Sequence, residues 1–134
     1  MTSAVPPIDD PAASPEVRAV YDDIRKTRDT DYINNFWQVL ANDPATLKRV
    51  WQGLKEVMGP GTLDPLTKEL IYLAVNITNG CAYCSHSHAA AAKAKGMTPA
   101  MFAELMAIVG MANQTNKLAD GYSVPVDERF LNLF

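Results

Sequence analysis

The sequence predicts an all-α protein, a compact bundle of about six to seven helices. Two observations lead to this prediction. Apolar residues recur at three- and four-residue intervals along most of the chain, which is the spacing of one helix face, whereas strand-like alternation of useful length is absent. In addition, a residue that caps helix N-termini well stands four times directly before a proline, the residue favoured at the first helical position. These pairs are Ser14-Pro15, Asp43-Pro44, Asp64-Pro65 and Thr98-Pro99.

The position of each helix follows from these start signals and from the glycines that end the apolar stretches. We expect helices at about 15–27, 44–58, 65–78, 81–95 and 99–118, and a short helix within 32–42. The glycines of Gly59-Pro60-Gly61, Asn79-Gly80 and Gly96 end three of them. The side chains expected to face inward are Val17, Val20, Tyr21, Ile24, Phe36, Trp37, Val39, Leu40, Leu47, Val50, Trp51, Leu54, Met58, Leu66, Leu70, Leu73, Ile77, Phe102, Leu105, Met106 and Val109.

The length of 134 residues suits one domain. We expect a flexible N-terminal arm over 1–14 and a single helical domain over 15–134. The apolar tail should dock on its own core or on a neighbouring subunit. Its residues are Val126, Phe130, Leu131 and Phe134.

Composition narrows the classes of partner and compartment. The net charge is only −3 and no basic run appears, so a nucleic acid partner is not expected. The apolar stretches are too short to span a bilayer, and residues 1–15 lack the charged and apolar regions of a signal peptide. These features, with the sparse cysteines, predict a cytoplasmic protein without a membrane partner.

The two cysteines are Cys81 and Cys84. A secreted protein of this size tends to carry more cysteines, spread apart so that they close large loops. A bridge between residues three apart closes almost no loop and adds little stability. The pair is therefore interpreted as chemical rather than structural.

On a helix that begins near Cys81, residues advance by about 100° each, so Cys81, Cys84 and His88 form one stripe. Unpaired N–H groups in a first helical turn stabilise a thiolate, which is the nucleophilic form of cysteine. His88 lies one turn beyond Cys84 and can take or return its proton. His86 falls on another side of the helix. The stripe predicts a redox-active dithiol with a proton acceptor.

Glu69 lies at the edge of the apolar face of its helix. A carboxylate there should be partly desolvated, so we expect the pKa of Glu69 to be raised. Only the tight Asn79-Gly80 turn separates this helix from the next one, so Glu69 is expected to orient His88 or to pass it a proton.

Together these residues resemble a known family. Glu69 precedes Cys81 by twelve residues, and His88 follows Cys84 by four. This spacing, with L-D-P-L-T-K-E-L-I-Y-L-A-V over 63–75 and N-G-C-A-Y-C over 79–84, is similar to the alkylhydroperoxidase D core of the carboxymuconolactone decarboxylase family. The resemblance covers about residues 17–109.

The resemblance implies a helical subunit that assembles into homo-trimers or homo-hexamers. It implies a thiol-dependent peroxidase or disulfide oxidoreductase of antioxidant defence, in which Glu69 and His88 relay protons to the cysteines. Cys84 would attack a small peroxide or disulfide, Cys81 would resolve the product, and an unidentified thiol would reduce the enzyme. No cofactor or metal ion is expected. Tyr83 departs from the family pattern, because the best-known peroxidases carry a second histidine there and tyrosine is a far weaker base near neutral pH.

Other interpretations stay open at this stage. The cysteines can be small buried hydrophobes, or zinc ligands together with His86 and His88, although one helix cannot aim all four side chains at one point. Glu69 can be an exposed residue paired with Lys68 or Lys93. The remaining functions are a carboxymuconolactone decarboxylase-type lyase, which the Cys-X-X-Cys pair disfavours, and a non-catalytic oligomeric binding protein.

Overall fold

A computed structural model describes residues 2–132 and confirms the all-α class. The described residues form six α-helices and two short 3₁₀ helices, without a strand. They divide into two compact units, one up to Gly59 and one from Pro60 onward. Each unit is described below by itself, and the single domain predicted over 15–134 stays a prediction.

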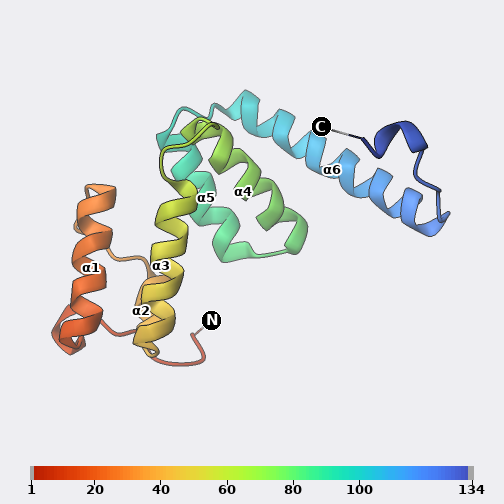
Figure 1. Cartoon of the computed structure of the whole chain (residues 1–134). Coiled ribbons are helices and arrows are strands. Elements are labelled where there is room, and N and C mark those ends of the chain that lie inside the picture. Colours follow the sequence, from red (N-terminus) through yellow and green to blue (C-terminus); the bar gives the residue numbers. More distant parts are fainter. Residues whose placement is uncertain (1, 133–134) are drawn as a thin grey trace. The chain divides into compact units, whose positions relative to one another are not determined.

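The helix boundaries agree closely with those expected from the caps. The helices are α1 (Pro15–Arg28), α2 (Asn35–Leu40), α3 (Pro44–Met58), α4 (Pro65–Asn79), α5 (Ala82–Ala94) and α6 (Pro99–Gly121) (Figure 1). The side chains of Ser14, Asp43, Asp64 and Thr98 each accept a hydrogen bond from the N–H three residues later. A local signal of four residues therefore fixes the start of four helices.

The first unit contains α1, α2 and α3 around one apolar core. Trp37 and Trp51 meet edge to face at its centre, with ring centroids 5.4 Å apart. The inward residues predicted for α1 are all buried there. The buried residues of this core are Ala13, Val17, Val20, Tyr21, Ile24, Ile33, Trp37, Ala41, Leu47 and Trp51.

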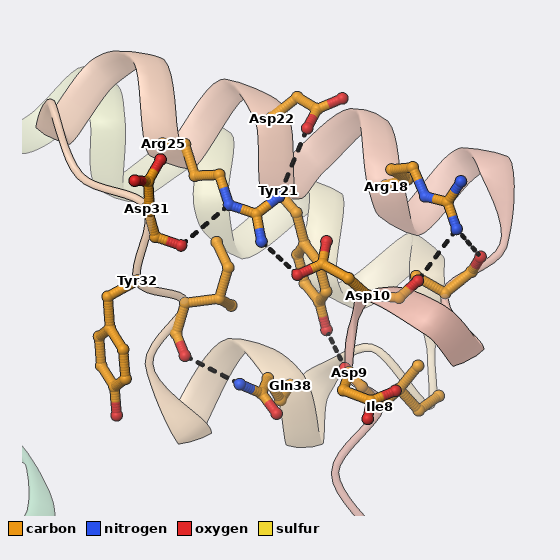
Figure 2. Close-up of polar contacts among 12 residues, drawn as sticks. Ile8, Asp9, Asp10, Arg18, Tyr21, Asp22, Arg25, Asp31, Tyr32 and Gln38 are labelled. Carbon is orange, nitrogen blue, oxygen red and sulfur yellow. Dashed lines mark hydrogen bonds and ion pairs between the residues drawn. The ribbon is translucent and has the colours of Figure 1, made fainter.

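The segment before α1 is hydrogen bonded to α1, as Figure 2 shows, and also to α2. The Tyr21 hydroxyl donates to the Ile8 carbonyl at 2.6 Å, and burial raises the pKa of Tyr21 to about 12. Arg25 pairs with the Asp10 carboxylate, and the Ile8 N–H donates to the Gln38 carbonyl at 2.9 Å. Part of the predicted arm over 1–14 is thus bound to helices in the structure, and its flexibility in solution stays a prediction.

The second unit contains α4, α5 and α6. Gly80 ends α4 in the left-handed conformation, with φ of 71°, and the N–H of Cys81 bonds back to the Asn76 carbonyl at 3.0 Å. This closing motif reverses the chain within two residues. As a result α4 and α5 lie side by side over most of their length (Figure 1).

Of the predicted core residues of α6, two are exposed and Leu105 is only partly buried. Val109 is buried, but Phe102 and Met106 are exposed on the single chain. The reason is that only one side of α6 packs against α4, so its remaining apolar side chains face outward. Of the predicted docking tail, Val126, Phe130 and Leu131 are also exposed, so they do not dock on the chain's own core, and Phe134 lies outside the described residues.

Within residues 2–132, none of the helices has the length and apolar character that a membrane span requires.

Candidate active site

The turn between α4 and α5 delivers Cys81 to the N-cap position of α5. Its sulfur accepts a hydrogen bond from the Cys84 N–H at 3.3 Å, as a serine or aspartate oxygen does at other helix starts. Cys81 and Cys84 are joined by a disulfide, with Cα atoms 5.3 Å apart, a common separation for such bridges. The two predicted thiols therefore lie within bonding distance of each other, at the N-terminal end of a helix, where free N–H groups stabilise a thiolate.

Asn76 holds this turn from the α4 side. It is one of two buried polar residues among those described, and its Nδ2 donates to the Cys84 carbonyl at 3.1 Å. The backbone carbonyl of Asn76 accepts a hydrogen bond from the Cys81 N–H. Asn76 therefore ties both cysteines to α4. The sequence interpretation missed it, although it lies seven residues, or two helical turns, after Glu69 and thus on the same face.

Glu69 and His88 meet as predicted. The Nδ1 atom of His88 lies 2.8 Å from Oε2 of Glu69, and the Glu69 side chain is only 5% exposed. The other carboxylate oxygen, Oε1, accepts a hydrogen bond from Nζ of Lys95 at 2.5 Å. The partner of Glu69 is thus Lys95 at the end of α5, rather than the Lys68 or Lys93 considered above.

The expectation of a raised pKa for Glu69 is wrong. Burial alone raises the pKa of this carboxyl group, but hydrogen bonds and positive charge from His88 and Lys95 outweigh that effect, and the pKa is lowered. Glu69 is therefore a carboxylate at neutral pH and can only accept hydrogen bonds. It follows that Nδ1 of His88 donates, which leaves Nε2 as the nitrogen that can exchange a proton.

Tyr72 restrains the imidazole ring from one face. Its ring stacks on that of His88 with centroids 3.8 Å apart and planes inclined by 16°. Tyr72 follows Glu69 by three residues on α4, so one helix face provides both the hydrogen bond and the stacking contact. The sequence predicted no role in the relay for Tyr72, although its spacing of three residues from Glu69 was an available signal.

The predicted alternatives for this region can be compared with the geometry. His86 is exposed, whereas His88 is largely buried and turned toward Glu69. In the part of the chain that the structure describes, no group of three or more His, Cys, Asp or Glu side chains is arranged to hold a metal ion.

This arrangement can support thiol chemistry. Cys84 precedes His88 by one helical turn, a spacing at which side chains are neighbours on a helix surface. A dithiol at a helix start, beside an imidazole whose tautomer is fixed by a carboxylate, has the parts needed to activate a thiol and to close a disulfide.

Comparison with known proteins agrees with this description. Residues 44–126 match the model of the carboxymuconolactone decarboxylase family. A crystal structure of an alkylhydroperoxidase AhpD core from Rhodospirillum rubrum ATCC 11170 is similar to this chain, with a TM-score of 0.94 and 57% sequence identity over 98% of this chain and 99% of that chain. No curated protein matches the sequence. On these grounds the chain belongs to the carboxymuconolactone decarboxylase family.

Proposed function

We propose that the protein is a thiol-dependent peroxidase or disulfide oxidoreductase of antioxidant defence. The observation that carries this proposal is the combination of a Cys81–Cys84 disulfide at the start of α5 with the Glu69–His88 hydrogen bond one turn further along. The 57% identity with a protein named as an alkylhydroperoxidase core supports the same class.

The proposed reaction begins with the reduced pair. Nε2 of His88 takes the proton of the Cys84 thiol, and the thiolate attacks the terminal oxygen of a small hydroperoxide. The O–O bond breaks, Cys84 becomes a sulfenic acid, and the alcohol leaves with a proton returned from His88. The Cys81 thiol then attacks the Cys84 sulfur, a disulfide forms and water leaves. An external thiol, whose identity the site does not specify, reduces the disulfide.

The assignment of Cys84 as the attacking thiol rests on the family resemblance and on its position beside His88. Cys81, as the N-cap, lies next to first-turn N–H groups that stabilise its thiolate, so it can act as the resolving thiol that attacks the oxidised Cys84 sulfur. If a small disulfide is the substrate, the same two thiols act in the same order through a mixed disulfide.

A lactone decarboxylase activity is less well supported, although the family's name includes it. Decarboxylation does not require two thiols within bonding distance, and the site has such a pair in Cys81 and Cys84. A non-catalytic binding protein requires no carboxylate–imidazole pair, and the site has one in Glu69 and His88.

Assembly into a homo-trimer or homo-hexamer is part of the proposal. Support comes from the number of large apolar side chains that the single chain leaves exposed in α6 and the tail, which an interface with other subunits would cover. These residues are Phe102, Met106, Ile108, Met111, Leu118, Val124, Val126, Phe130 and Leu131. Light scattering that finds only a monomer would contradict this part.

The deciding experiment follows the reaction of the reduced protein with an organic hydroperoxide by stopped flow, in the native protein, Cys84→Ser and Cys81→Ser. We expect fast consumption in the native protein, loss in Cys84→Ser, and one turnover without disulfide formation in Cys81→Ser. Fast consumption that survives in Cys84→Ser would move the attack to Cys81.

If all three proteins consume the hydroperoxide at the rate of free cysteine, the peroxidase function is excluded. The same reduced proteins would then be mixed with a small aromatic disulfide. Slow exchange there as well would refute the redox proposal as a whole.

A further inference from the structure

Lys95 lies where the proposed relay needs a permanent positive charge. It follows His88 by seven residues, which is close to two turns of helix, so the two side chains project from the same face of α5, His88 from its middle and Lys95 from its C-cap. His88 contacts one oxygen of the Glu69 carboxylate, and Lys95 donates to the other. The carboxylate is buried, whereas the Lys95 side chain is 38% exposed and keeps contact with water.

The balance of charge around Glu69 explains why a second partner matters. A buried carboxylate with His88 as its only partner would be neutralised only when the imidazole carries its own positive charge. A histidine held in that form cannot accept a proton from a thiol. A lysine stays protonated across the physiological pH range and balances Glu69 whatever the state of His88.

We propose that Lys95 is a positioning residue of the relay, which holds the Glu69 carboxylate and balances its charge so that His88 is free to exchange a proton with the thiol. This inference rests on the proposed function for its role in the reaction. Lys95 acts through Glu69 and needs no contact with the substrate or the sulfur atoms.

Other charged groups do not replace Lys95 in this arrangement. The side chain that faces His88 from α4, besides Glu69, is the stacked Tyr72. The helix α6 also packs on α4, and none of its charged residues forms a hydrogen bond or ion pair with Glu69 or His88 within the described residues. The charged residues of α6 are Glu104, Lys117 and Asp120.

Removing the Lys95 charge should raise the pH at which the Glu69–His88 pair takes up a proton. Without it, an added proton is more favourable on the Glu69–His88 pair, whichever of the two residues takes it. The pair then takes up a proton at higher pH. Since Lys95 is partly exposed and the interaction is screened by water, we expect a shift of about 0.5 to 1 pH unit.

The test compares Lys95→Met with Lys95→Arg, which keeps the charge, and with Lys93→Met, which removes a charge from an exposed position of the same helix. The first readout is the His88 ring titration followed by NMR, which is tractable because the chain has only two histidines. The second is the pH profile of kcat/KM for an organic hydroperoxide.

We expect both midpoints to rise by about 0.5 to 1 pH unit in Lys95→Met, with Lys95→Arg and Lys93→Met close to the native protein. At pH values below the native midpoint the reaction rate should fall roughly three- to tenfold in Lys95→Met, while the plateau at high pH is retained. A merely structural role would lower the rate at all pH values and leave the midpoints unchanged.

An unchanged His88 midpoint in Lys95→Met would overturn the inference. A raised His88 midpoint in Lys95→Met, together with a native protein that reacts fast with neither an organic hydroperoxide nor a small disulfide, would uphold the charge balance at Glu69 and refute the proposed function instead, so the two failures can be told apart.

Discussion

Replacement of Glu69 by glutamine tests the centre of the proposed relay. Glutamine has the same shape and its Oε1 can still accept the hydrogen bond from Nδ1 of His88, but it carries no charge. Charge-assisted hydrogen bonds are about twice as strong as neutral ones, so the imidazole loses much of its orientation and basicity. General acid–base groups contribute about 10²- to 10⁴-fold. Because Glu69 acts through His88, we expect kcat/KM to fall about 10- to 100-fold.

The cost to stability should be smaller than that of a typical broken buried ion pair. Removing one partner of a buried ion pair, which leaves the other charge unpaired, lowers the free energy of unfolding by about 3–5 kcal/mol. Here the cation left behind is Lys95, whose side chain is 38% exposed and can turn to water, and His88 can become neutral. The remaining cost is that of weakened hydrogen bonds, about 1–2 kcal/mol, measurable by urea unfolding.

The control is Glu56→Gln, the same substitution at an exposed position of α3. It should leave both the rate and the unfolding free energy close to those of the native protein. A Glu69→Gln protein with the native kcat/KM would refute the relay. A loss of stability well above about 3 kcal/mol would refute the argument that Lys95 relaxes into solvent.

Further predictions concern the tyrosine, the turn and acid stability. Tyr72→Leu removes the stacking contact with His88, worth about 0.5–1.5 kcal/mol, and should lower kcat/KM about two- to tenfold, whereas Tyr72→Phe should be close to native in the same assay. Gly80→Ala adds a Cβ that meets nothing within 4 Å, but φ is +71°, so we expect about 1 kcal/mol of destabilisation in thermal or urea unfolding. Gly53→Ala, which has equal space without a positive φ, should be neutral or stabilising, and equal effects at both sites would contradict the backbone argument. The pKa of Glu69 in the folded chain lies below its ordinary value of 4.5, so its contribution to stability is complete above that value and is lost as the pH falls through the lowered one. Urea unfolding from about pH 6 to pH 3 should therefore show a shallower loss in Glu69→Gln than in the native protein, and parallel curves would refute the lowered pKa.

Much of the fold could be predicted because its signals are local. Asp64 caps α4 by accepting the N–H of Thr67, and Pro65 occupies the first helical position between them. All of these interactions lie within four residues, so the sequence contains them completely. The proximity of Cys81 and Cys84 follows in the same way from their spacing of three at a helix start.

The meeting of Glu69 and His88 could be anticipated for a related reason. A turn of two residues between helices forces them to lie against each other, and both residues belong to the faces that then meet. What the spacing could not give is the balance of forces on the carboxylate. Desolvation was foreseen, but the second hydrogen bond that reverses the direction of the pKa shift was not.

The sequence by itself determined the all-helical class, the helix boundaries and the closeness of Cys81 to Cys84, and it pointed to Glu69 and His88 as the residues of the proposed relay. The tertiary structure alone decided that Lys95, rather than Lys68 or Lys93, balances Glu69, that Tyr72 stacks on His88, and that Phe102 of α6 stays exposed on the single chain. The physical reason is the separation along the chain between the residues that interact. Caps and turns are formed between residues a few positions apart, whereas the partner of a buried side chain depends on how far two packed helices are shifted along each other and on which faces they leave uncovered.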